Sequence, residues 1–141
     1  MRFFKRLGTV ILLAAALTAC ANAKSVAQKP ADAGTARSFE APFATVKDAA
    51  YGALKLLKLY PEGEQDTAES HVILLARPPH GMSWGEVGRI TVEKSPTPPT
   101  MVRVVYDKRT PFQLTGGEEG FSRRLFERMD GLLAKQTSQS D

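Results

Sequence analysis

The sequence predicts an α+β fold of two layers, an antiparallel sheet of three to four strands flanked along the chain by two amphipathic helices. Three observations predict this α-β-β-β-α order. Apolar residues recur at helical spacing in residues 42–59 and again in residues 118–135. Between these segments, residues 62–107 hold β-rich runs with two-residue alternation. The whole chain has 141 residues, which fits a single domain.

The first helix is expected over residues 42–59. Pro42 suits the first helical turn, because its missing N–H has no partner there, and Pro61 ends the element. Gly52 costs ~1 kcal/mol relative to Ala inside a helix, and a close contact between helix and sheet would explain it. The apolar stripe consists of Phe43, Val46, Ala50, Ala53, Leu54 and Leu57.

Strands are expected in residues 72–76, 84–94 and 100–107, with a short polar fourth strand near residues 62–67. Residues 95–99 are too rich in proline for a tight hairpin and predict an extended loop. Alternation gives the last two strands one apolar face, made of Gly88, Ile90, Val92, Val102, Val104 and Tyr106. The helices should cover this face. The opposite face, expected to point into solvent, carries Arg89, Thr91, Glu93 and Arg103.

The second helix is expected over residues 118–135, with two acidic residues at its positive N-terminal end. Its apolar stripe consists of Phe121, Leu125, Met129 and Leu132. The polar residues 136–141 are expected to form a disordered tail. Residues 20–38 are small and polar, with a single Val and no aromatic before Phe39, which predicts a flexible tether. The folded domain is therefore expected over residues 39–135.

A targeting segment precedes the tether. Residues 1–6 carry three basic side chains and no acid, and residues 7–19 form an apolar run too short to cross ~30 Å of hydrocarbon. Residues 1–19 therefore read as a secretory signal. Without them the formal charge falls from +4 to +1, because 16 basic residues then face 15 acids. Nucleic acid is accordingly excluded as an expected partner.

The signal ends in Leu17-Thr18-Ala19-Cys20, and in this it resembles the signals of bacterial lipoproteins. The resemblance implies diacylglyceryl transfer to the Cys20 sulfur, cleavage before Cys20 and acylation of the new amine. Ala21 stands where an Asp would favour retention in the inner membrane. An anchor in the outer membrane, facing the periplasm, is therefore expected. Two or three acyl chains suffice for stable anchoring, so the membrane is an expected partner.

A second resemblance concerns residues 39–135 and rests on packing patterns. The segments that carry it are Phe39-Glu40-Ala41-Pro42-Phe43, Gly88-Arg89-Ile90-Thr91-Val92, Val102-Arg103-Val104 and Phe121-Ser122-Arg123-Arg124-Leu125-Phe126. They are similar to small α-β-β-β-α lipoproteins of unknown function and, more loosely, to the helix-grip domains of the C-subunit lipoprotein of the β-barrel assembly machine. This resemblance implies a fold rather than an activity.

Candidate catalytic groups are few. Gly81-Met82-Ser83-Trp84-Gly85 satisfies the G-x-S-x-G pattern, but no histidine follows Ser83 and no helix is expected directly after it. His71 and His80 have no carboxylate or thiol at metal-ligand spacing and are expected on the surface. The acidic residues of 62–69 lack the order of a calcium loop. The sequence therefore predicts neither an enzyme nor a bound metal or cofactor.

An interaction surface is the remaining prediction. Its candidate residues lie on the open sheet face, in the loop of residues 108–117 and along the second helix, and are Arg89, Arg103, Phe112, Leu114, Arg124 and Arg128. The first hypothesis is a noncatalytic protein-interaction or assembly-accessory module that contacts another envelope protein. The alternative is a small ligand- or lipid-binding periplasmic domain with a groove between helix and sheet.

Overall fold

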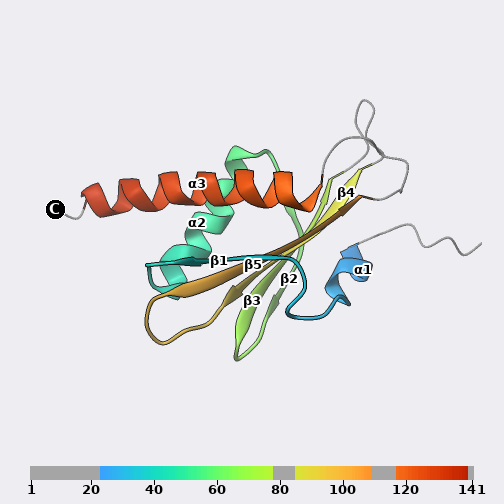
Figure 1. The fold of residues 1–141 in the computed structure, drawn as a ribbon, viewed down its shortest axis with the longest axis horizontal. Coiled ribbons are helices and arrows are strands. Elements are labelled where there is room, and N and C mark those ends of the chain that lie inside the picture. The colour runs from blue at the N-terminus through green and yellow to red at the C-terminus, as the bar shows by residue number, and fades with distance from the viewer. Residues whose placement is uncertain (1–22, 78–84, 109–116, 140–141) are drawn as a thin grey trace, which may run out of the picture.

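The computed structural model describes residues 23–77, 85–108 and 117–139 and has an α+β fold with one antiparallel sheet (Figure 1). The fold class is confirmed. The sheet has five strands rather than three to four, in the order β1-β5-β4-β3-β2. In chain order the elements are α1 (Ala23–Ala27), β1 (Thr35–Phe39), α2 (Phe43–Leu56), β2 (Pro61–Asp66), β3 (Ser70–Arg77), β4 (Glu86–Glu93), β5 (Thr100–Lys108) and α3 (Glu118–Gln139).

Strands β2 to β5 form an antiparallel meander, and the short polar strand expected near residues 62–67 is present as β2. Strand β1 pairs with the other edge of β5, with Thr35 opposite Val104. The predicted alternation in β4 and β5 is confirmed, because Ile90 lies opposite Val104 and both are fully buried.

Helices α2 and α3 cover one face of the sheet and enclose the main core with it (Figure 1). The ring of Phe121 in α3 stacks on Tyr106 of β5 with centroids 4.1 Å apart. Gly52 lies against α3, since an added Cβ would stand 2.8 Å from Leu132 Cδ1. The close contact predicted at Gly52 is therefore made between the two helices, not between helix and sheet.

The expected tether is a structured part of the fold over its described residues. Helix α1 lies against the sheet face opposite α2 and α3, and β1 extends the sheet. We call residues 23–34, which comprise α1 and the turn after it, the N-terminal strap. Here the prediction was wrong, because composition alone does not report the pairing partners that the rest of the chain supplies.

The C-terminal tail also differs from its prediction. Helix α3 continues to Gln139, so residues 136–139 are helical rather than a disordered tail. Their side chains are exposed, as their polar sequence implies. None of the helices in the described ranges is both long enough and apolar enough to span a bilayer.

Candidate functional site

The N-terminal strap covers an apolar patch on the sheet face that was expected to be open. Val26 of the strap is fully buried against Val87 and Val105, with Ala33 and Ala76 at the margin. Burial of one valine side chain stabilises a fold by ~1.5–3 kcal/mol. The strap is thus docked by a small core of its own.

Arg89 fastens this strap to the sheet. Its Nη1 donates to the carbonyl oxygens of Val26 at 3.1 Å and Lys29 at 2.6 Å, and its Nη2 donates to that of Pro30 at 2.7 Å. The side chain is only 5% exposed, so the prediction of Arg89 in solvent was wrong. Burial, followed by the charge of Arg103, lowers the pKa of the guanidinium. Its partners are backbone carbonyl oxygens of the strap. One guanidinium can bind several of them at once because its N–H donors have a fixed planar arrangement.

Two more contacts hold the strap at its rim. Lys29 Nζ donates to Asp107 Oδ2 at 2.9 Å, and Arg103 Nη1 donates to the Asp32 carbonyl at 3.1 Å. Arg103 is half-buried rather than freely exposed. The side chains of Lys29 and Arg103 therefore both help to hold the strap against β5.

The predicted interaction residues do not form one surface. Arg124 and Arg128 are exposed on α3, which packs on the sheet face opposite Arg89 and Arg103. Phe112 and Leu114 lie outside the described residues. So do Cys20, Ser83 and His80, which leaves the lipidation and catalytic-serine predictions without structural description.

A chain of polar side chains joins α2 to strands β2 and β3. Tyr51 Oη lies 2.7 Å from His71 Nε2, His71 Nδ1 lies 3.1 Å from Asp66 Oδ1, and Lys94 Nζ donates to Asp66 Oδ2 at 2.9 Å. His71 is 8% exposed, so its expected place on the surface was wrong. Burial of its ring is possible because both ring nitrogens have partners.

The order Tyr, His, Asp is that of a nucleophile, a base and an orienting group. Burial, followed by a hydrogen bond to Glu64 and the charge of that carboxylate, raises the pKa of the Tyr51 hydroxyl. Hydrogen bonds from Lys94 and His71 lower the pKa of Asp66. The two contacts of the His71 ring, with Tyr51 of α2 and with Asp66 of β2, tie the helix to the sheet.

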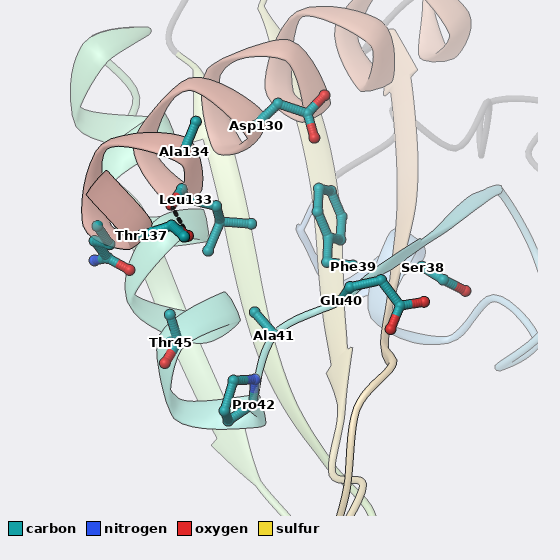
Figure 2. A pocket seen from close by; sticks show the side chains of 11 residues that line it. Ser38, Phe39, Glu40, Ala41, Pro42, Thr45, Asp130, Leu133, Ala134 and Thr137 are labelled. Atoms are coloured by element: carbon teal, nitrogen blue, oxygen red, sulfur yellow. Dashed lines mark hydrogen bonds between the residues drawn. The ribbon is translucent and has the colours of Figure 1, made fainter. Parts of the chain in front are cut away.

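A groove of about 610 Å³ lies away from this network, at the end of the sheet where β1 leads into α2 (Figure 2). Phe39, which is 4% exposed, and Leu133 give it an apolar interior, while Glu40 and Asp130 stand at its rim. The hydroxyl of Thr137 is turned back onto the Leu133 carbonyl at 3.2 Å. The groove is built from two segments of the chain, residues 38–45 and residues 130–137, and for that reason no local sequence pattern predicts it.

Within the described part of the chain, no three His, Cys, Asp or Glu side chains gather as ligands for a metal ion. The geometry thus offers a docked strap, a polar tie and an open groove. Comparisons of the chain with protein-family models, with curated proteins and with solved structures found no match.

Proposed function

We propose that this chain is a membrane-anchored lipoprotein of the outer membrane, facing the periplasm, whose α+β domain contacts another envelope protein without catalysis. The observation that carries the anchor is the sequence Leu17-Thr18-Ala19-Cys20 at the end of a basic and then apolar leader. Acyl chains on Cys20 supply ~0.8 kcal/mol per buried CH₂, enough for stable anchoring when two or three are present.

The groove and the edge of β1 support contact with a protein. Strand β1 pairs only with β5 among the described strands, so its outer edge offers unpaired backbone groups. It contains no proline and a single charged residue, Arg37. The opposite edge strand, β2, begins with Pro61, carries a register shift and holds three acids, features that discourage strand addition.

The occupant we propose is an extended segment of a partner protein that pairs along β1. Such strand addition takes its affinity from backbone hydrogen bonds and its specificity from side-chain pockets. Because Ser38 and Phe39 belong both to β1 and to the groove, an apolar side chain of the added strand would enter the groove directly.

The alternative is a ligand- or lipid-binding domain. The groove volume favours it, since small-molecule sites commonly span ~300–1,000 Å³. Against it stands the shape of the groove, which is open along its charged rim rather than enclosed. An open groove beside a strand edge suits a protein segment better than it suits a small ligand, which is usually enclosed away from solvent.

Photo-crosslinking in cells separates these two functions. A crosslinking residue at Thr45 or Thr137, on either side of the groove, is expected to give a covalent adduct with one envelope protein. The matched control is Glu127, exposed on α3 outside the groove, which should give none. An adduct with a lipid or small molecule at the groove positions supports the alternative. Equal adducts at all three positions, or none, would contradict a groove-borne partner.

A further inference from the structure

The place where the strap meets the sheet limits how far the domain can stand from its anchor. Helix α1 begins at Ala23, only three residues after Cys20. Three residues span at most ~11 Å when fully extended. A free tether from residue 20 to residue 38 would instead reach ~60 Å. Docking of the strap thus removes most of the freedom that the sequence suggests.

The strap and the groove lie at opposite ends of the molecule. Figure 1 shows α1 at one end of the sheet and the C-terminal end of α3, which lines the groove, at the other. Thr35, just after the strap, donates to Glu118 Oε1 at 3.0 Å, so α3 starts beside the strap. Lys135 lies 17 residues further along α3, which amounts to ~26 Å at 1.5 Å per residue.

The short link from Cys20 to α1 limits the distance between the domain and its anchor, and the position of the groove at the opposite end sets which end faces away from it. The strap cannot leave the sheet without exposing Val26 and without separating Arg89 from the carbonyl oxygens that it binds. We propose, on the basis of the lipid anchor at Cys20, that the docked strap holds this domain directly against the lipid surface. The strap end then faces the headgroups, and the groove end points away from the membrane toward the partner.

The chemistry of the contact is set by the covalent anchor rather than by charge. Two basic residues at the rim of the strap face have partners within the chain, Lys29 with Asp107 and Arg103 with the Asp32 carbonyl. Because the proposed anchor is covalent, the same orientation is expected on zwitterionic and on anionic lipids. This separates the proposal from electrostatic binding to anionic headgroups.

The test uses the full lipidated protein in phosphatidylcholine vesicles that carry a headgroup quencher. One fluorophore is attached at Ala31→Cys in the strap, and in a second variant at Lys135→Cys near the end of α3. Both positions are exposed, so neither label disturbs the core. We expect loss of most fluorescence at position 31 and little loss at position 135. Vesicles with anionic lipid should give the same pair of values.

A Gly/Ser insert of the strap's length, placed after Ala21, is the matched control because it leaves every described residue in place. The insert should reduce quenching at position 31 to the level seen at position 135. Equal quenching at both positions in the protein without the insert, or an insert without effect, overturns the proposal and leaves the anchor intact. If flotation with vesicles does not depend on Cys20, as judged by Cys20→Ser, the proposed function fails and this inference fails with it.

Discussion

Tyr51 shows how one partly buried hydroxyl can link protonation to stability. Its oxygen lies 2.7 Å from His71 Nε2, and its environment raises the pKa of the phenol above the ordinary value of 10.0. A raised pKa in the folded state means that the folded protein holds this proton more tightly than the unfolded chain does. The stabilisation is therefore complete below about pH 10 and is lost as the pH rises beyond it.

The variant Tyr51→Phe tests this link. At pH 7 it should lower the free energy of unfolding by ~1 kcal/mol, the net value of one hydrogen bond. A tyrosine in the unfolded chain ionises near pH 10. Between pH 9 and pH 11, the free energy of unfolding of Tyr51→Phe should therefore fall less steeply than that of the parent protein. Urea unfolding at each pH measures both effects. Tyr60→Phe is the control, because Tyr60 is 72% exposed. An unchanged pH slope in Tyr51→Phe would show that the phenol is not the titrating group.

At the scale of elements, the strap and β1 depend on a backbone conformation that glycine permits. Gly34 has φ +93° and lies so close to β5 that an added Cβ would stand 2.1 Å from the Val104 carbonyl oxygen. A side chain at this position would clash with the backbone of β5, and the residue would also have to adopt a positive φ that L-residues disfavour. The turn that leads from the strap into β1 can be closed in this form because residue 34 has no side chain.

Gly34→Ala should destabilise the protein by ~1–3 kcal/mol and increase hydrogen exchange in the strap and β1 more than in β3. Gly131→Ala is the matched control. An added Cβ at Gly131 meets nothing within 4 Å, and the helical position should gain up to ~1 kcal/mol from the same substitution. Equal effects at the two glycines, or exchange that rises uniformly, would contradict the close approach at Gly34.

The elements that the sequence predicts are those whose own residues carry the apolar pattern. Helices α2 and α3 and strands β3 to β5 each bury a periodic stripe, and their positions follow from it. Strand β1 escapes prediction because four of its five residues are exposed and it is held by pairing with β5. The strap escapes for a similar reason, since Arg89 reaches it from 60 residues away in the chain.

The same limit applies to the candidate sites. His71 reads as a surface residue until Tyr51 and Asp66 are placed beside its ring nitrogens. The groove needs β1, α2 and α3 together, so neither its volume nor its lining can be derived from any one segment. Alternation correctly gives Arg89 and Arg103 one shared face, but it does not show that the strap covers that face.

At the scale of the whole molecule, we propose that one end of the fold is anchored and the other end contacts a partner. The strap occupies one end of the sheet, and the groove beside β1 occupies the other (Figure 1). An anchored module of this shape would present the groove and the β1 edge to proteins on the side away from the lipid. The proposed orientation depends on one chemical event, the lipidation of Cys20.

Mass spectrometry of the mature protein isolated from membranes tests that event most directly. We expect a chain that begins at Cys20, lacks residues 1–19 and exceeds the polypeptide mass by a diacylglyceryl group with or without an N-acyl chain. The Cys20→Ser variant should yield no such species. A mature chain that retains residues 1–19, starts at another residue or carries Cys20 as a free thiol would contradict the lipoprotein assignment.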